Sequence, residues 1–277
     1  MFHDPRAVLK AHNLWTKKHF GQNFLVDPTV PGRIVQCGGV SADDTVFEIG
    51  AGCGTLTRAL APAAGRVIAL EYDRDLVPVA RAETAWAEHV EIREGNVLDV
   101  HWPDLEKEVG APLLVYGNLP YHLSTQIILS LLQAPTSWRR ACFMLQKEFA
   151  ERLAAPPGTR AAGALSVQAA LWSVTSLVFY VPPGSFHPPP KVDSAVIVME
   201  RREEPAVDVG DPAQFRIVVR ALFAQRRKMA RKALKSVCDN VDTLLEEAGL
   251  DGRRRGETFS LDEIGALSRA LYNQRTR

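Results

Sequence analysis

Residues 45–58, TVFEIGAGCGTLTR, decide the fold that we expect for this chain. The apolar run 45–49 is typical of a buried strand, and the glycines that follow let the backbone approach a ligand closely. A dinucleotide fingerprint would place its third glycine at position 55, where Thr55 stands, so nicotinamide binding is disfavoured. The stretch therefore predicts a strand and ligand loop of an α/β domain whose cofactor is of another kind.

Two further predicted strands end in polar side chains that suit a nucleoside. Glu71 follows the strand 66–70, where a carboxylate can accept both hydroxyls of a ribose, and Asp73 is the alternative for that role. The strand around 90–92 leads to Asn96, whose amide can read an adenine edge. A Glu after a strand is commonly just solvated, but together these groups place ligand contacts on successive strand ends.

A further strand end carries the run Asn118-Leu119-Pro120-Tyr121, after the apolar residues 113–116. The Asn118 amide oxygen and the Pro120 carbonyl can each accept one N–H of a planar exocyclic amine, while Tyr121 stacks on the base. Proline stiffens such a turn. The alternative is an ordinary strand-to-helix turn, although open α/β sheets bind their ligands at this edge.

Two domains are expected. The 277 residues suffice for a full α/β core and a smaller second domain. Acidic residues, proline and glycine cluster at 202–212, as linkers do, and the later sequence has helical patterns over 212–237, 241–248 and 261–271, the last capped by Ser260. We therefore predict an α/β domain over residues 1–202 and a helical domain over residues 203–277.

The helical tail carries an unbalanced positive charge, although the formal net charge of the whole chain is only +1. No acidic residue interrupts the basic ones between Arg216 and Lys235. Phosphate contact is the preferred interpretation and a solvated helix face is the alternative. The residues expected to contact RNA are Lys17, Lys18, Arg226, Arg227, Lys228 and Arg231.

The remaining composition fits an ordinary cytoplasmic enzyme. The four cysteines are scattered without metal-binding spacing, and the histidines form no H-E-x-x-H motif, so no metal is expected. We find no run of about eighteen apolar residues and no signal-peptide pattern, which argues against membrane insertion and secretion. We expect a monomer in a reducing cytoplasm.

Six motifs, in this order, resemble the rRNA adenine N6,N6-dimethyltransferases, the kasugamycin-resistance family. They are FGQNFL at 20–25, EIGAGCGTLT at 48–57, NLPYHLST at 118–125, MLQKEFAERL at 144–153, FHPPPKVDSAV at 186–196 and QRRK at 225–228. The resemblance covers nearly the whole chain. It implies a seven-stranded, doubly wound, Rossmann-like class I methyltransferase sheet with a small all-helical C-terminal domain, and S-adenosylmethionine as methyl donor.

The resemblance also implies a substrate: N6 of two adjacent adenosines in the hairpin near the 3′ end of small-subunit rRNA, with a role in small-subunit maturation. The chain departs from the family pattern at Asn96, where Asp is usual, at His122 and Leu123, which replace Asn and Ile, and at Ala162, where Tyr is common. None of these departures replaces Asn118, Pro120 or Tyr121.

The expected site has one part that binds the methyl donor and one part that holds the target base. The donor residues are Gln22, Asn23, Leu25, Glu48, Gly50, Gly52, Glu71, Asn96 and Asn118, and the catalytic residues are Asn118, Pro120, Tyr121 and Phe186. Phe186 precedes the rigid His187–Lys191 stretch, which is short of N–H donors for strand pairing. We expect its ring to be exposed and to stack on the second face of the base; packing under the sheet is the alternative.

The expected reaction is direct displacement, in which the adenine nitrogen attacks the sulfonium methyl in line. Acceptors at residues 118 and 120 localise the nitrogen lone pair, and no strong base is needed beforehand. Four alternatives stay open at this point. They are a large-subunit enzyme of the macrolide-resistance type, a ribosome-assembly factor whose catalysis is secondary, a DNA adenine methyltransferase and, weaker still, a cytosine C5 enzyme.

Overall fold

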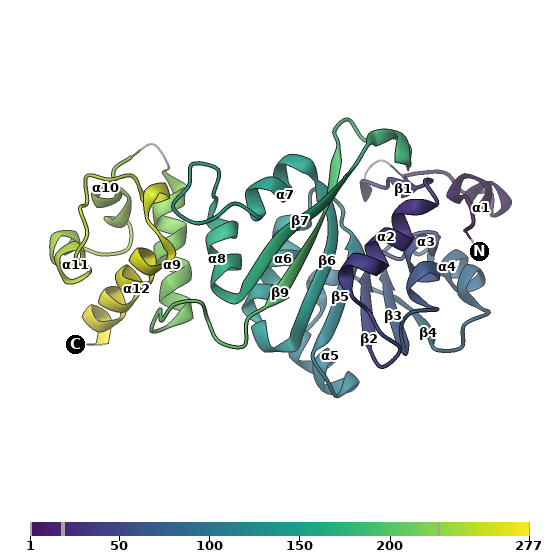
Figure 1. The fold of residues 1–277 in the computed structure, drawn as a ribbon, viewed down its shortest axis with the longest axis horizontal. Helices are drawn as coiled ribbons and strands as arrows, with labels where there is room; N and C mark the ends of the chain where they lie inside the picture. The colour runs from purple at the N-terminus through teal and green to yellow at the C-terminus, as the bar shows by residue number, and fades with distance from the viewer. Residues whose placement is uncertain (1, 18–19, 226–227, 277) are drawn as a thin grey trace. The chain divides into compact units, whose positions relative to one another are not determined.

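The strands of the larger compact unit form a doubly wound sheet (Figure 1). The computed structural model describes residues 2–17, 20–225 and 228–276. It divides into two units, one comprising Met1–Ala150 with Ser176–Arg201 and the other comprising Glu151–Thr175 with Arg202–Arg277. The expected α/β class is confirmed. The second unit takes in Glu151–Thr175 as well as the tail, which the predicted boundary at residue 202 did not anticipate.

The sheet has the seven strands that the family resemblance implied, in the order β4-β3-β2-β5-β6-β9-β7. Strands β2, β3, β4, β5 and β6 are parallel neighbours, and β9 joins β6 in antiparallel register. The strands are β2 (Thr45–Ile49), β3 (Arg66–Glu71), β4 (Val90–Glu94), β5 (Leu113–Asn118), β6 (Trp138–Gln146), β7 (Ser173–Val181) and β9 (Ser194–Arg201). The order reverses between β2 and β5, and that switch point is where such sheets bind ligands.

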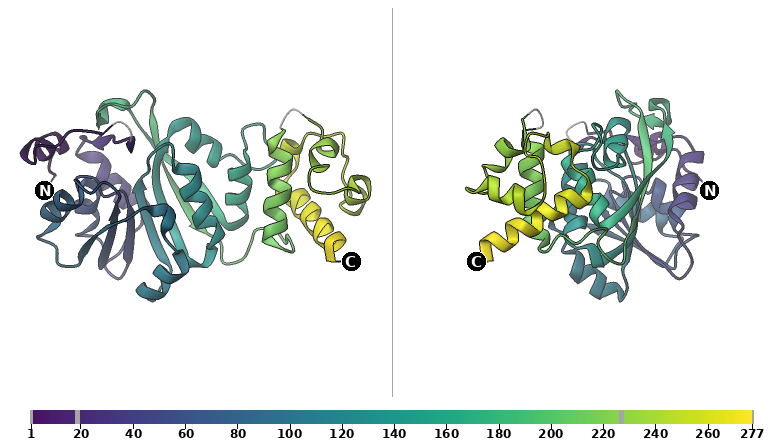
Figure 2. Two further views of the ribbon diagram at one scale, coloured as in Figure 1. Left: turned by 180° about the vertical axis from the view of Figure 1, so that it is seen from behind. Right: turned by 60° about the vertical axis from the view of Figure 1, so that its left-hand side comes forward.

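Helices lie on both faces of this sheet (Figures 1 and 2), so its central strands are almost continuously buried and apolar. The helices that follow one another along this part of the chain are α1 (Pro5–Ala11), α2 (Thr29–Gly38), α3 (Thr55–Leu60), α4 (Val77–Thr84), α5 (Trp102–Val109), α6 (Ser124–Gln133) and α7 (Lys147–Leu153). A short antiparallel pair, β1 (Phe24–Leu25) with β8 (Phe186–His187), forms a separate two-stranded sheet.

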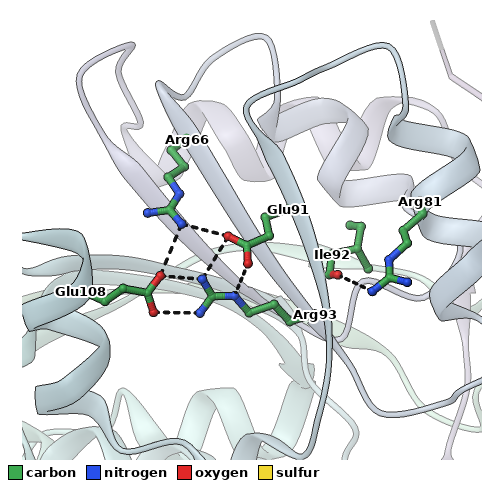
Figure 3. A network of polar contacts seen from close by, with 6 residues as sticks. All are labelled: Arg66, Arg81, Glu91, Ile92, Arg93 and Glu108. Atoms are coloured by element: carbon green, nitrogen blue, oxygen red, sulfur yellow. Dashed lines mark hydrogen bonds and ion pairs between the residues drawn. The ribbon is translucent and has the colours of Figure 1, made fainter.

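An ion-pair network holds the edge strand β4 in place (Figure 3). The Arg93 guanidinium lies between Glu91 and Glu108, with Nε 2.7 Å from Glu91 Oε1 and Nη2 2.5 Å from Glu108 Oε1. Arg66 Nη2 on β3 adds a contact of 2.8 Å to Glu91 Oε2. The hydrogen bonds from Arg93 and then Arg66 lower the pKa of Glu91 to about 2. The network thereby links β3, β4 and α5 through charges that are partly exposed.

The second unit is helical around its own apolar core. Its helices are α8 (Ala164–Trp172), α9 (Pro212–Ala224), α10 (Ala230–Leu234), α11 (Val241–Glu247) and α12 (Leu261–Thr276). Ser260 caps α12 as predicted, because its Oγ accepts the Glu263 N–H at 3.2 Å while Glu263 Oε2 accepts the Ser260 N–H at 2.7 Å. The expectation of one helix over 212–237 is wrong. Gln225 has φ −132° and ψ 55°, outside the helical region, so α9 ends at Ala224.

Candidate active site

A pocket of about 350 Å³ opens at the carboxyl ends of β2, β3 and β5. Every residue that we predicted for the methyl donor lines it, as do three of the predicted catalytic residues. These are Gln22, Asn23, Leu25, Glu48, Gly50, Gly52, Glu71, Asn96, Asn118, Pro120 and Tyr121. The structure therefore brings together groups that are up to about a hundred residues apart in the chain; their individual roles stay predictions.

The glycine loop after β2 fixes the carboxylate at the end of β3. Gly50 and Gly52 have φ of 81° and 56°, which residues with a side chain rarely adopt. In that conformation the Gly52 N–H donates to Glu71 Oε2 at 2.7 Å, and the Asp73 N–H donates to Oε1 at 2.8 Å. A Cβ on Gly52 would lie only 3.1 Å from the Phe24 ring. Glu71 is thus held by two backbone donors at the wall of the pocket.

Asp73, the alternative ribose acceptor, is occupied by protein contacts. Its Oδ1 accepts from Lys17 Nζ at 2.6 Å and from the Asp75 N–H at 3.1 Å, and its Oδ2 accepts from Gln22 Nε2 at 2.8 Å. Lys17 also contacts Asp75 Oδ2 at 2.6 Å. The expectation that Lys17 extends a basic RNA surface is therefore not supported, because two carboxylates neutralise it. Glu71 remains the better ribose acceptor.

Glu48 is a buried acid in the same pocket. Only 1% of the residue is exposed, and its Oε2 has no hydrogen bond within the described part of the chain. Burial, with a smaller contribution from the charge of Glu71, raises the pKa of Glu48 to about 8. Burial is also the main cause that raises the pKa of Glu71. An uncompensated buried carboxylate is costly, so this wall of the pocket favours a cationic ligand.

The Asn118 amide is oriented by a contact with the N-terminal segment. Its Nδ2 donates to the backbone oxygen of Asn23 at 3.0 Å, although the two residues are 95 positions apart. Its Oδ1 has no hydrogen-bond partner among the residues that the structure describes. The geometry thus leaves the oxygen, and not the nitrogen, available to a donor group in the pocket.

The Pro120 carbonyl, in contrast, is already engaged. It accepts the Leu123 N–H at 2.9 Å and the Ser124 hydroxyl at 3.1 Å, which uses both of its lone pairs within the turn. The expectation that this carbonyl is available to a substrate amine is contradicted. The carbonyl of the preceding Leu119 accepts no hydrogen bond among the described residues. The Leu119 N–H donates to Met144 O at 3.1 Å. The turn therefore offers Leu119 O next to Asn118 Oδ1.

The two aromatic residues predicted to sandwich the base lie in different environments. Tyr121 lines the pocket, and its hydroxyl is 2.7 Å from Ser194 Oγ, which fixes the tip of the ring. Phe186 does not line the pocket and is only 3% exposed. Its backbone pairs with Leu25 in the β1–β8 ladder, and its ring belongs to the apolar core with Leu25. The expectation of an exposed Phe186 outside any strand is wrong; the packing alternative holds.

Asn96 and its neighbours form the remaining wall. Asn96 Oδ1 accepts the Leu98 N–H at 3.0 Å and caps a short turn, which leaves the Nδ2 group without a protein acceptor in the described chain. Tyr72, which was not among the predicted site residues, lines the pocket, is 60% exposed and contacts Phe20 edge-to-face at 5.6 Å. An exposed aromatic residue directly after the acid at a strand end is the signal that identifies it.

In the helical unit, tertiary contacts join two basic segments. Met229 forms an antiparallel bridge with Arg255, and the Ala230 N–H donates to Arg254 O at 2.8 Å. This places the exposed Lys228 next to the tract 253–255, which the sequence analysis did not single out. Arg254 itself pairs with Glu263.

Two of the basic residues predicted to contact RNA in this unit, Lys228 and Arg231, belong to the part of the chain that the structure describes. Lys228 is exposed, and Arg231 Nε lies 2.9 Å from Asp242 Oδ1 in an exposed ion pair. The predicted RNA contacts Lys18, Arg226 and Arg227 lie outside the described residues. Within the described ranges there is no group of three or more metal-ligating side chains and no helix long and apolar enough to span a membrane.

Comparison with known proteins assigns a chemistry to this arrangement. The profile of a family described as ribosomal RNA adenine dimethylase matches residues 13–264. A protein of Magnetococcus marinus named ribosomal RNA small subunit methyltransferase A is 44% identical over 263 residues, which cover 95% of this chain and 94% of that protein. A Clostridium perfringens protein of the same name is 41% identical over 269 residues, covering 96% of this chain and 94% of that protein.

Solved structures agree on the fold. A dimethyladenosine transferase from Plasmodium falciparum superposes with a TM-score of 0.75 at 21% identity, covering 91% of this chain and 98% of that one. The 23S rRNA methyltransferase ErmE superposes with a TM-score of 0.69 at 26% identity, covering 90% of this chain and 100% of that one.

Proposed function

Because the chain belongs to the ribosomal RNA adenine dimethylase family, we propose how its pocket performs the reaction of that family. The protein is an rRNA adenine dimethyltransferase, and it acts on adenines of small-subunit rRNA. We further infer that the substrate is N6 of two adjacent adenosines in the 3′-terminal hairpin and that the donor is S-adenosylmethionine. A ribosomal substrate of this kind places the enzyme in the cytoplasm.

The pocket fits the proposed donor at its charged end. S-adenosylmethionine, when bound, supplies an electrophilic methyl group on a cationic sulfur. Glu48 carries a buried oxygen without a partner, and it is the side chain that suits the ammonium group of the methionine portion. Glu71, held by the backbone at Gly52 and Asp73, keeps lone pairs for the two ribose hydroxyls.

The adenine ring of the donor requires an apolar surface to pack on and one polar side chain that hydrogen-bonds to a ring nitrogen. Tyr72 and Leu98 line the pocket, and both side chains are exposed. The Asn96 Nδ2 group can donate to a ring nitrogen of adenine, while its oxygen stays with the Leu98 N–H. The Asn in place of the usual Asp thus changes a charged acceptor into a neutral donor at this position.

Asn118 is the residue on which the proposal for catalysis rests. Its nitrogen is tied to the Asn23 backbone, so its free oxygen can accept one hydrogen of the target amine. We assign the second hydrogen to the Leu119 carbonyl, because the Pro120 carbonyl is engaged within the turn. Two acceptors of this kind localise the lone pair of the target nitrogen for in-line attack. Neither acceptor is a base, so each transferred methyl group displaces a proton to solvent.

Tyr121 is assigned to the face of the target base. Its hydroxyl bond to Ser194 restrains the ring without engaging its face. The target adenosine has to leave its own stack to reach this pocket, and stacking on an aromatic ring offsets part of that loss. Because Phe186 is buried in the core, Tyr121 carries this role without it.

The helical unit is assigned to the RNA backbone. Its exposed basic residues are gathered from two segments by the Met229–Arg255 bridge, and phosphate contacts position a protein on a nucleic acid without reading sequence. We retain Arg226, Arg227, Lys228 and Arg231 in this assignment and add Arg253 and Arg255.

A labelled-donor assay tests the proposal. Purified protein is incubated with methyl-labelled S-adenosylmethionine and small ribosomal subunits that lack the modification, and the digested RNA is analysed for N6,N6-dimethyladenosine. We expect labelled dimethyladenosine from these subunits and no label from subunits already dimethylated at the site. Asn118→Ala is the matched control, which should leave the RNA unmodified because the target amine loses its side-chain acceptor. Label in large subunits alone would instead identify an enzyme of the macrolide-resistance type.

A further inference from the structure

We propose that Cys37 and Cys142 form a reversible, peroxide-sensitive disulfide that ties helix α2 to strand β6. Their Sγ atoms lie 3.7 Å apart, although the residues are 105 positions apart in the chain. Two sulfur atoms at this separation are in van der Waals contact, so only a short approach leads to the bonded distance of about 2.0 Å. This pair lies outside the donor pocket, and the inference does not rest on the proposed function.

Cys37 has the properties of the attacking thiol. It is partly exposed near the end of α2, whereas Cys142 is fully buried in β6. Arg33 precedes it by one helical turn, and Arg140 Nη1 donates to the backbone oxygen of the adjacent Gly38 at 3.2 Å. A hydrogen bond from the Cys142 thiol and the charge of Arg33 lower the pKa of Cys37. A partly exposed thiol in electropositive surroundings is the form that reacts with oxidants.

Cys142 has the properties of the resolving thiol. Solvent does not reach it, and the contact with Cys37 together with burial raises its pKa, so it stays a thiol until its neighbour is oxidised. In the reduced protein both sulfur atoms also lie within hydrogen-bonding distance of the Ile34 carbonyl, at 3.3 Å from Cys37 and 3.6 Å from Cys142. The two thiols therefore already converge on one point of α2.

The chemistry requires only hydrogen peroxide. The Cys37 thiolate attacks one peroxide oxygen, an S–O bond forms, the O–O bond breaks, and the departing hydroxide takes up a proton to become water. Cys142 sulfur then attacks the Cys37 sulfenic acid, so that the S–S bond forms, the S–O bond breaks and a second water leaves with the Cys142 proton. Two thiols are oxidised by two electrons in total, and one peroxide is reduced to two water molecules.

The predicted consequence is stabilisation and not damage. The disulfide closes a long loop between α2 and β6 and restricts the unfolded chain, which should raise the melting temperature by about 5 °C. Neither cysteine lines the pocket, so donor affinity should be unchanged. A thiol reductant should reverse both the bond and the shift.

The full-length reduced protein is treated with a small excess of hydrogen peroxide and analysed by mass spectrometry without reduction. We expect the loss of two hydrogen atoms and a cross-linked peptide that joins Cys37 to Cys142. Cys142→Ser should instead accumulate a sulfenic acid on Cys37, which dimedone labels, and Cys37→Ser should leave Cys142 unreacted. Cys238→Ser is the matched control, since Cys238 belongs to the other unit and should not alter the cross-link.

Two results would overturn the inference. One is that wild-type Cys37 accumulates as dimedone-labelled or overoxidised sulfur to the same extent as in Cys142→Ser, without a cross-link. The other is a cross-link that forms with no rise in melting temperature and with loss of donor binding, because α2 would then have been distorted and not fastened in its native position.

Discussion

Donor affinity should rise with pH between about 6 and 8, because Glu48 must lose its proton before it can pair with the donor's ammonium group. The residue is buried, and its pKa is raised to about 8. At pH 7, one pKa unit below that value, only about one molecule in ten has Glu48 ionised, which penalises binding by about 1.4 kcal/mol. The affinity should therefore increase by up to about tenfold per pH unit and level off above pH 8.

Isothermal titration calorimetry measures this dependence at pH 6, 7, 8 and 9. Below pH 8 the binding should release a proton, which appears as a difference in heat between buffers of unequal ionisation enthalpy. Glu48→Gln keeps the shape of the side chain but cannot ionise, so its affinity should lose this component of the pH dependence. The donor's own amine titrates equally for both proteins and cancels in the comparison. Equal pH slopes for wild type and Glu48→Gln would refute the reasoning and remove Glu48 from the ammonium site.

Four further predictions concern other parts of the structure. Glu71→Ala should weaken donor binding by about 1–3 kcal/mol, because two ribose hydroxyls lose their acceptor; unchanged affinity in calorimetry would place the ribose elsewhere. Tyr121→Ala should slow turnover, because the loss of base stacking should raise the activation free energy by about 1–3 kcal/mol, whereas Tyr121→Phe should retain activity. A loss of donor affinity in the alanine variant would instead put the ring in the donor pocket. Replacing Lys228 and Arg231 with Gln should lower the slope of log affinity against log salt for small subunits by about 0.7–0.9 per lost phosphate contact, and equal slopes would return these residues to a solvated surface. Glu91, with its pKa lowered to about 2, should stabilise the folded state above pH 4.5 and lose that contribution as the pH falls toward 2. Because its side chain is 45% exposed, the contribution to the free energy of unfolding should stay below about 1 kcal/mol. Thermal melts in which Glu91→Gln differs from wild type by the same amount at pH 2 and at pH 7 would contradict this prediction.

Local sequence patterns were sufficient for the central strands and for the polar side chains at their carboxyl ends. The strand 45–49, its glycine loop and the acid at position 71 were placed correctly, because buried parallel strands are continuous apolar runs and their carboxyl ends meet at one edge. The N-cap of the last helix was also predictable, since Ser260 and Glu263 are three residues apart and make a local pair.

The errors lie where a distant contact overrides a local signal. Phe186 stands beside a rigid proline-rich stretch, but pairing with Leu25 draws it into the core. Lys17 belongs to a basic local sequence, yet Asp73 and Asp75 bind its ammonium group from 56 and 58 residues away. Pro120 was the natural acceptor in the sequence motif, and only the turn geometry shows that its carbonyl is already used.

The sequence by itself determined the class of fold, the edge of the sheet that binds ligands and the main polar residues at that edge, because these depend on hydrophobic period and on chain order. The tertiary structure alone decided which lone pairs remain free there: Asn118 presents its oxygen because Asn23, 95 residues earlier, accepts from its nitrogen. It also decided that Glu48 has a raised pKa and that two thiols are in contact. Hydrogen-bond partners and desolvation are set by whichever atoms surround a group in space, and spacing along a chain does not specify them.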